Sequence, residues 1–234
     1  MKNAIVLCSG GIDSVTTANY VKRRLDYQKI IILFFNYEQK TLKQERIASK
    51  KCAKKLNAEF REINLKWLGK ISESLINKKG VSKISRKDLK NTLKESEKFY
   101  VPCRNTLFLI YALALAESEF VKNKSQIDIF VGFKNEGEEP FPDATERFTK
   151  KINELSRISC TGKFKIIAPL IKRDKEDIIK MGIKLGINYK DTFSCYTNKT
   201  PKHCGACLAC KLRQAGFYWA NIPDPTNYEL KEKY

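Results

Sequence analysis

The sequence predicts an α/β protein in which an open, parallel five-stranded sheet has helices on both faces and is followed by a small cysteine-rich metal module. Short apolar runs alternate with helix-like stretches along the first 170 residues or so. These runs are almost unbroken in apolar character, as in parallel strands that are covered on both faces. Four cysteines then fall within sixteen residues. We therefore divide the chain into a main domain, residues 1–190, and a module with its tail, residues 191–234.

Strands and helices are expected to alternate along the main domain. The strands are placed at residues 3–8, 30–37, 58–63, 127–132 and within 163–170, and the helices at 14–25, 40–56, 106–119 and 174–185. Another helix and a polar, acidic loop separate the last two strands. Helices of this length between strands imply right-handed crossovers and a parallel sheet.

Some segments carry more specific expectations. In the helix at 40–56, the positions expected to face inward are Ile47, Ala48, Cys52 and Leu56. The helix at 106–119 is apolar nearly all round and is expected to be buried. Residues 66–98 are rich in Lys and Ser and weakly periodic, which predicts a helix and a surface excursion. A loose tail is expected to start at residues 223–225, Pro-Asp-Pro.

The composition argues against a disordered, membrane-spanning or disulfide-stapled chain. The chain has 234 residues, of which 42% are hydrophobic. Its longest apolar stretch, Leu107–Ala116, is about half of the roughly 20 residues needed to cross a bilayer. Eight cysteines without a secretory signal indicate a reducing compartment. We expect a cytoplasmic protein that has no membrane partner.

The net charge is strongly positive but does not identify a partner. Lys and Arg number 45 against 26 Asp and Glu, a formal charge of +19. Such a balance often accompanies nucleic acid or polyphosphate binding. However, 35 of the 45 are Lys and 10 are Arg, and phosphate and base recognition favours Arg. We favour a solvated lysine-rich surface, then attraction of a small polyanion such as ATP, and expect no direct nucleic-acid partner.

The sequence SGGIDS, residues 9–14, lies between the first strand and the first helix. Glycines let backbone N–H groups converge on an anion, and the helix N-terminus adds partial positive charge. The hydroxyls of Ser9 and Ser14 can donate to phosphate oxygens. The segment matches neither GxxxxGK[ST] nor GxGxxG. The alternative is an ordinary tight turn in which Asp13 or Ser14 is the helix N-cap.

The clustered cysteines predict a closed metal site. The four are Cys195, Cys204, Cys207 and Cys210, one thiolate followed by CxxCxxC. Four thiolates complete a zinc tetrahedron and leave no position for catalytic water. An iron–sulfur cluster is the main alternative, and free thiols are the other. His203 is expected to be an exposed neighbour rather than a ligand, and the surplus negative charge can be offset by Lys199, Lys202, Lys211 and Arg213.

The glycine segment resembles the PP-loop of ATP pyrophosphatases, which cleave ATP to AMP and pyrophosphate while adenylating an acyl or amide oxygen. More of the chain resembles one of these families, the 7-cyano-7-deazaguanine synthases. Besides SGGIDS, the matching elements are NYEQK at 36–40, VPCRN at 101–105, FSCY at 193–196 and CGACLACKLR at 204–213. They span nearly all of residues 1–218 in the family's order.

The resemblance implies a PP-loop fold of the adenine nucleotide alpha hydrolase type and a ligase that forms carbon–nitrogen bonds. Its substrates would be 7-carboxy-7-deazaguanine, ammonia and two ATP, and its product 7-cyano-7-deazaguanine, a precursor of queuosine or archaeosine in tRNA. The acid and then the amide would be adenylated. Mg²⁺ and a structural Zn²⁺ are the implied metals. A homodimer is common in such folds, and the sequence leaves the oligomeric state open.

Residue roles follow from the motifs and the resemblance together. Catalytic roles fall to Ser9, Asp13, Arg104 and Lys175. Arg104 can form a bidentate pair with a carboxylate or phosphate, or alternatively cap a surface charge. The nucleotide is expected to contact Cys8, Ser9, Gly10, Gly11, Ile12, Asp13, Ser14, Val15, Thr16, Thr17 and Ala18. The acid is expected to contact Tyr37, Gln39, Arg104, Asn105, Glu136, Phe141 and Asp143.

The loop at residues 135–143 departs from the usual bacterial pattern, ETDFSGYPDCR. Here it reads NEGEEPFPD and resembles a variant of archaeal members. Its acidic residues can coordinate Mg²⁺ or pair with the N–H edge of a guanine-like base, or simply form a solvated turn. The identity of the base is therefore less constrained than the adenylation chemistry.

Three other functions are alternatives. One is a PP-loop enzyme that thiolates tRNA, against which no added RNA-binding domain is visible and no motif supports a sulfur-carrying role for Cys8 or Cys103. Another is a paralogue that conjugates deazaguanine to a different acceptor. The third, a zinc module that binds nucleic acid without catalysis, leaves the glycine segment unexplained.

Overall fold

The computed structural model describes residues 2–134 and 141–230. Its strands are β1 (Asn3–Leu7), β2 (Lys29–Asn36), β3 (Glu59–Asn64), β4 (Ile127–Phe130) and β5 (Ile166–Ile167). Its α-helices are α1 (Ile12–Arg23), α2 (Leu42–Lys55), α3 (Lys66–Ile71), α4 (Leu93–Glu97), α5 (Arg104–Asn123), α6 (Glu146–Ser159), α7 (Lys175–Lys184) and α8 (Leu208–Ala220). Short 3₁₀ turns are η1 (Arg86–Lys90), η2 (Pro142–Ala144) and η3 (Tyr189–Asp191).

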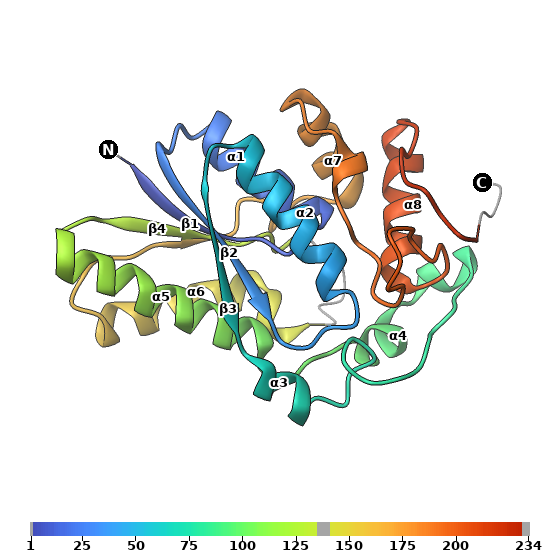
Figure 1. The fold of residues 1–234 in the computed structure, drawn as a ribbon, viewed down its shortest axis with the longest axis horizontal. Coiled ribbons are helices and arrows are strands. Elements are labelled where there is room, and N and C mark those ends of the chain that lie inside the picture. The colour runs from blue at the N-terminus through green and yellow to red at the C-terminus, as the bar shows by residue number, and fades with distance from the viewer. Residues whose placement is uncertain (1, 135–140, 231–234) are drawn as a thin grey trace.

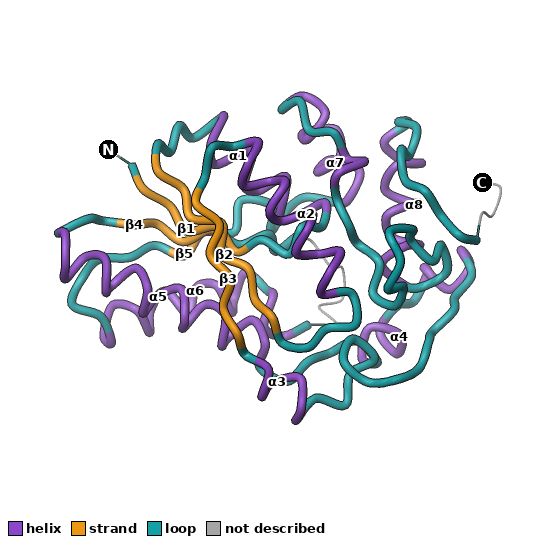
Figure 2. Tube along the Cα trace, in the orientation of Figure 1, coloured by secondary structure: helices purple, strands orange, loops and turns teal. Residues whose placement is uncertain are grey.

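The five strands form one parallel sheet in the order β3-β2-β1-β4-β5, which confirms the predicted fold class (Figure 2). From β1 the chain steps outward to β2 and β3, then returns to place β4 on the other side of β1. The strand order therefore reverses between β1 and β4. In open α/β sheets, ligands bind beyond the carboxyl ends of the strands at such a reversal.

Helices cover both faces of the sheet, α1 and α2 on one and α5 and α6 on the other (Figure 1). Alternate residues of β1 divide between two cores, as a pleated strand requires. Ala4 and Val6 pack with residues of α1, α7 and α8. Ile5 and Leu7 pack with residues of α5. Helix α8 also places Phe217 in the first core, so the end of the chain is part of the main hydrophobic structure.

Two predicted burial patterns were wrong. Ile47 on α2 is 43% exposed, since the helix turns this position toward solvent while its neighbours pack inward. Helix α5 is longer than the predicted 106–119 and is not buried all round: Ile110, within the predicted range, is 40% exposed, and Val121, beyond it, is 61% exposed. A helix that lies across one face of a sheet buries a single stripe, which here consists of Leu109, Ala112, Leu113 and Ala116.

The outer edge of the sheet at β5 is closed by a side chain of α6. Residues on either side of Ile166 bond to β4, because Ile129 N–H donates to Lys165 O and Val131 N–H to Ile167 O. The outward-facing groups of Ile166 are taken by Asn153, whose Nδ2 donates to Ile166 O and whose Oδ1 accepts from Ile166 N–H, at 2.8 and 2.9 Å. The edge strand therefore offers few free backbone groups.

The excursion and the tail both attach to the cysteine module. Ile84 N–H, in the excursion, donates to Ala206 O at 2.9 Å. The prediction of a loose tail was wrong for residues 223–230, because His203 N–H donates to Asn227 O and Glu229 N–H to His203 O. The tail thus runs beside the module (Figure 1). Within the described ranges, no helix combines the length and apolarity that crossing a membrane requires.

Candidate active site and metal site

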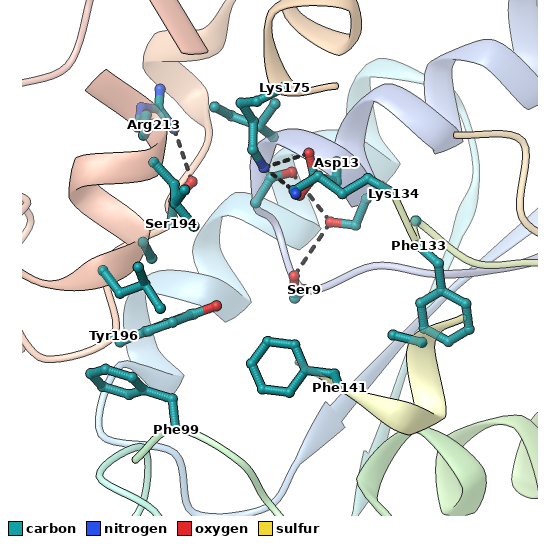
Figure 3. Close-up of a pocket in the computed structure, with 18 of the residues that line it drawn as sticks. Ser9, Asp13, Phe99, Phe133, Lys134, Phe141, Lys175, Ser194, Tyr196 and Arg213 are labelled. Atoms are coloured by element: carbon teal, nitrogen blue, oxygen red, sulfur yellow. Dashed lines mark hydrogen bonds and ion pairs between the residues drawn. The ribbon is translucent and has the colours of Figure 1, made fainter. Parts of the chain in front are cut away.

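A cavity of about 670 Å³ opens at the carboxyl ends of β1, β2 and β4. Its walls come from the glycine segment, from the start of α5, from α7 and from the region around the cysteines (Figure 3). This is the position that the reversal of strand order predicts. The volume lies in the usual range for small-molecule sites, roughly 300–1,000 Å³.

Two glycines shape the turn between β1 and α1 in different ways. Gly10 has φ +84°, and a Cβ there would lie 2.6 Å from Ala48 Cβ and 2.8 Å from Glu45 O, so only glycine fits. Gly11 is the N-cap of α1 and has no side-chain cap hydrogen bond. No capping side chain therefore covers the first N–H groups of α1, whose residues line the cavity.

The serines of the turn lie close together. Ser9 Oγ and Ser14 Oγ are 3.4 Å apart, and Ser14 Oγ donates to Gly11 O at 3.2 Å. Both line the cavity. Gly132, just beyond β4, keeps the opposite wall close, because a Cβ there would stand 3.0 Å from Ser14 N. The hydroxyls and N–H groups thus converge on one small volume.

Asp13 is in the first turn of α1, whereas the N-cap is Gly11, so the expected cap at Asp13 or Ser14 was wrong. Its carboxylate accepts two hydrogen bonds from Lys175 Nζ, at 2.6 and 2.7 Å, across 162 positions of sequence (Figure 3). Gly216 on α8 makes room for this lysine, because a Cβ there would lie 2.3 Å from Lys175 Cγ. A cation is thereby held at the glycine turn.

The predicted nucleotide segment divides in two. Cys8, Ser9, Gly11, Ile12, Asp13 and Ser14 line the cavity. Val15, Thr16, Thr17 and Ala18 belong to α1 and are buried, and Thr16 Oγ1 lies 2.9 Å from Tyr189 Oη. Four consecutive residues point to all sides of a helix, so this part of α1 is enclosed by the protein all round, and the four support the turn rather than line the cavity.

Arg104 lines another part of the cavity, at the start of α5. Its guanidinium carbon is 5.9 Å from the centre of the Tyr37 ring. Burial opposes the charge of Arg104, but Tyr37, Tyr196 and Asp143 outweigh burial and raise the pKa of the guanidinium. Burial raises the pKa of Tyr37 to about 12, so its hydroxyl stays protonated. Arg104 is therefore a cation directed at the cavity and does not cap a surface charge.

Asn105 and Asp143 bind each other. The backbone N–H of Asn105 donates to Asp143 Oδ2 at 3.1 Å, and its Nδ2 donates to Asp143 Oδ1 and O at 3.2 Å. The pair fixes η2 against α5 beside Arg104. Phe141 lines the cavity next to this pair. Glu136, also predicted to contact the substrate, lies outside the described residues.

Gln39 directs all its amide atoms at the protein. Its Oε1 accepts from Tyr37 N–H at 3.0 Å, and its Nε2 donates to Phe35 O and to Glu45 Oε2 at 3.0 and 3.1 Å. It is 3% exposed. Its contribution to the site is thus to order Tyr37 and Glu45.

Three aromatic rings surround the end of the cavity opposite Lys175 (Figure 3). Phe99 and Tyr196 contact each other with centroids 5.0 Å apart, and Phe141 faces the same space. Flat apolar rings of this kind stack on planar heterocycles. The cavity therefore combines a phosphate-type end with an end suited to a base.

The four cysteine sulfurs all lie within 4.8 Å of one another. The Cys195–Cys207 distance is 4.0 Å and the Cys204–Cys210 distance 3.8 Å. A tetrahedron with metal–sulfur bonds of about 2.3 Å has edges of about 3.8 Å. A single ion therefore fits, whereas a cluster of several irons would hold the sulfurs farther apart because each would bind a different iron.

The pKa shifts of the four thiols show that their simultaneous ionisation needs a bound cation. Hydrogen bonds from the other three thiols lower the pKa of Cys204 far below its usual value, while hydrogen bonds from Cys195 and Cys204 raise that of Cys210. The pKa of Cys195 is also lowered, to about 7, whereas the neighbouring thiols and burial raise the pKa of Cys207, so ionisation is opposed at Cys207 and Cys210. All four sulfurs can ionise together only around a positive ion.

His203 was predicted to be exposed, and this was wrong. It is 4% exposed, packed between Phe193 and Tyr228. Burial lowers its pKa to about 3, so the ring is neutral, and its Nε2 accepts a hydrogen bond from Ser194 N–H at 3.0 Å. It is not one of the four clustered ligands.

Comparison with known proteins assigns the family. The family model described as "Queuosine biosynthesis protein QueC" matches residues 3–221. The chain belongs to the QueC family. The 7-cyano-7-deazaguanine synthase of Methanosphaera stadtmanae is 37% identical to it, over 97% of this chain and 98% of that protein. The enzyme of the same name from Rickettsia felis is 34% identical, over 97% and 100%.

A solved structure of a 4-thiouridine synthetase–RNA complex with bound ATP is a more distant likeness. It is 15% identical, with a TM-score of 0.48, over 97% of this chain and 47% of that chain. At this distance the likeness says nothing of function.

Two residues that line the cavity of this QueC family member, Ser194 and Arg213, were not predicted as site residues. Arg213 was assigned to charge balance alone, yet it is 1% exposed and donates to Thr192 Oγ1, Tyr189 O and Ser194 Oγ at 2.8, 2.9 and 3.1 Å. Ser194 in turn lines the cavity. The position of Ser194 next to Cys195 could have indicated its place at the site, because a residue adjacent to a predicted metal ligand is held rigidly.

A backbone hydrogen bond joins the cysteine module to the glycine turn of this family member. Phe193 N–H donates to Gly10 O at 2.9 Å. Ala48, whose Cβ closes off Gly10, packs in one cluster with Cys195, Cys207 and Cys210. The cysteine cluster therefore supports the turn that faces the cavity.

Proposed function

We propose that the chain converts 7-carboxy-7-deazaguanine, ammonia and two ATP into 7-cyano-7-deazaguanine, two AMP and two pyrophosphates. Membership of the QueC family over residues 3–221 carries the proposal. The cavity supports it, because one end suits a triphosphate and the other a flat, charged acid. Its volume, about 670 Å³, is in the usual range for small-molecule sites.

The glycine turn would bind the β- and γ-phosphates. Ser9, Ser14 and the free N–H groups at the start of α1 are donors, and Lys175 supplies a positive charge beside them. When ATP enters, Lys175 can exchange Asp13 for a phosphate oxygen without a large movement. Donors fixed before the reaction stabilise the charge that develops on the leaving pyrophosphate.

The acid would bind at the other end. Its carboxylate would pair with Arg104, and its ring would stack among Phe99, Tyr196 and Phe141. This pose directs a carboxylate oxygen toward the phosphate end of the cavity. Attack on the α-phosphorus forms an acyl adenylate and releases pyrophosphate, and ammonia then displaces AMP to give the amide.

The second half repeats the adenylation on the amide oxygen, and loss of AMP leaves the nitrile. Carboxylate and amide oxygens are poor leaving groups, which is why each must be adenylated. The protein contributes chiefly by positioning the reactants and stabilising charge. Mg²⁺ would neutralise the phosphates, with Asp13 as an outer contact.

The four-cysteine site would hold Zn²⁺ in a structural role. Its sulfur separations match a zinc tetrahedron, and four protein ligands leave no position for water. Reduced thiols of this kind suit the cytoplasm. We propose a small-molecule acid and ammonia as the partners, with no direct contact to nucleic acid.

The test is release of AMP and pyrophosphate from ATP by the purified protein. We expect release only with 7-carboxy-7-deazaguanine and ammonia, and two ATP consumed for each nitrile. Ser9→Ala should lower turnover about 10- to 100-fold, the value of one hydrogen bond to a charged group. Ser159→Ala, on the exposed end of α6, is the matched control. Release that depends on tRNA instead would establish a thiolation-type reaction.

A further inference from the structure

One carboxylate in the cavity has no part in phosphate or acid binding. Glu45, in the first turns of α2, lines the cavity. Its Oε1 accepts from Thr41 Oγ1 at 2.5 Å and its Oε2 from Gln39 Nε2 at 3.1 Å. Each oxygen has a further lone pair, so the group is held in place without being saturated.

Glu45 lies between the two ends of the site. Its own carbonyl oxygen is 2.8 Å from the position that a Cβ on Gly10 would take, so this turn of α2 abuts the glycine turn. Its carboxyl group is also close enough to Arg104 for the positive charge of the guanidinium to stabilise the carboxylate. The reacting carbon must sit between the phosphates and Arg104, which is the space Glu45 borders.

The surroundings favour proton transfer by this group. Burial raises the pKa of the Glu45 carboxyl, and Thr41, Gln39 and Arg104 only partly offset the rise. A more basic carboxylate is a better proton acceptor at neutral pH. Of the other described carboxylates lining the cavity, Asp13 is bound to Lys175, and Asp174 and Glu176 flank that lysine on α7.

We propose that Glu45 is the catalytic base that removes protons from the incoming nitrogen. This inference rests on the proposed function. In the first half, the ammonia lone pair forms the C–N bond, AMP leaves with the electrons of the C–O bond, and one N–H proton passes to Glu45. In the second, the adenylated amide loses both N–H protons to Glu45 in turn as AMP departs and the nitrile forms.

The experiment separates adenylation from nitrogen chemistry. Acid-dependent exchange of labelled pyrophosphate into ATP measures adenylation alone. Amide formation from ammonia measures the step that needs the base. Hydroxylamine is mostly uncharged at neutral pH and loses its proton readily after attack, so it depends on the base less.

For Glu45→Gln we expect exchange to remain, ammonia-dependent turnover to fall about 100-fold or more, and hydroxamate formation to fall less than about tenfold. Glu45→Asp should recover part of the ammonia-dependent rate. Glu62→Gln, in an ion pair with Arg46 away from the cavity, is the matched control.

Equal losses with both nucleophiles and in exchange would overturn the proposal and leave Glu45 a structural partner of Gln39 and Thr41. Absence of exchange in the unaltered protein would instead remove the proposed function itself, so the two failures are distinguishable.

Discussion

The glycine turn and the cysteine module are built on opposite principles. The four ligands of the module lie within sixteen residues and meet through local turns. The turn uses backbone groups of residues 9–14, but its cation arrives from Lys175, 162 positions away. A site with local ligands can be found from spacing alone. In a site assembled by topology, spacing alone marks only the local part, and the prediction of Lys175 needed the resemblance to known sequences.

The two regions nevertheless depend on each other. Phe193 N–H bonds to Gly10 O, and Arg213 orients Ser194 toward the same cavity. The module is thus part of the wall of the cavity. Perturbing each region separately will show which one supports the other.

The largest effect is expected from Cys207→Ser. Loss of a buried ligand should release the metal and lower the free energy of unfolding by more than about 4 kcal/mol, since metal binding is coupled to folding. Elemental analysis and denaturant unfolding measure both quantities. Cys160→Ser, outside the cluster, is the control. An unchanged unfolding midpoint after metal loss would mean that the stability of the fold does not depend on the module.

A smaller, sharper effect is expected from the two glycines. Gly10→Ala is strained by its positive φ and clashes with Ala48, so it should destabilise the fold by about 1–3 kcal/mol. In Gly11→Ala the nearest atom is 3.6 Å away, so stability should hold. That Cβ would lie near Ser9 Oγ and Ser194 Oγ, however, and should weaken ATP binding. Thermal unfolding and calorimetric titration distinguish the pair; identical behaviour would count against a phosphate site at this turn.

The smallest effect concerns Asp191, which joins α2 to η3 at the start of the module. Its carboxylate is 2.5 Å from Lys55 Nζ and 3.4 Å from Lys51 Nζ. The hydrogen bond from Lys55 lowers its pKa below 3.8 despite partial burial. Both lysines are about half exposed, so Asp191→Asn should cost less than about 1 kcal/mol.

The pH dependence of that cost follows from its sign. Because the folded-state pKa is the lower one, the stabilisation is present above pH 3.8 and is lost as the pH falls through the folded value. Unfolding at pH 7 and at pH 3 measures it. A cost that persists at low pH would mean that Asp191 acts through packing.

Much of the fold could be predicted because its signals are local. Apolar runs bounded by turns placed all five strands within a few residues, and CxxCxxC placed the cysteines. Solvent exposure on long helices was harder. Nothing in the apolar composition of α5 says that Val121 lies on its outer side, since that depends on which stripe meets the sheet.

The site was predictable only where a motif marks it. Ser9 and Lys175 were predicted and both line the cavity, whereas Glu45, which also lines it, was not predicted, because an acid in a polar helix resembles any solvated residue in sequence. His203 was misplaced for the converse reason: its burial comes from Tyr228 in the tail, which was itself expected to be loose. Contacts between distant segments decide these cases.

The two hydrogen bonds between Asn153 and Ile166 affect the tendency of copies of this chain to aggregate through their sheet edges. Exposed strand edges can recruit a strand from a neighbouring molecule and so nucleate fibrous aggregates. Here a single amide on α6 already satisfies both outward-facing groups of the short terminal strand. The β5 edge of the folded protein therefore offers few backbone groups with which a strand of a neighbouring molecule could pair.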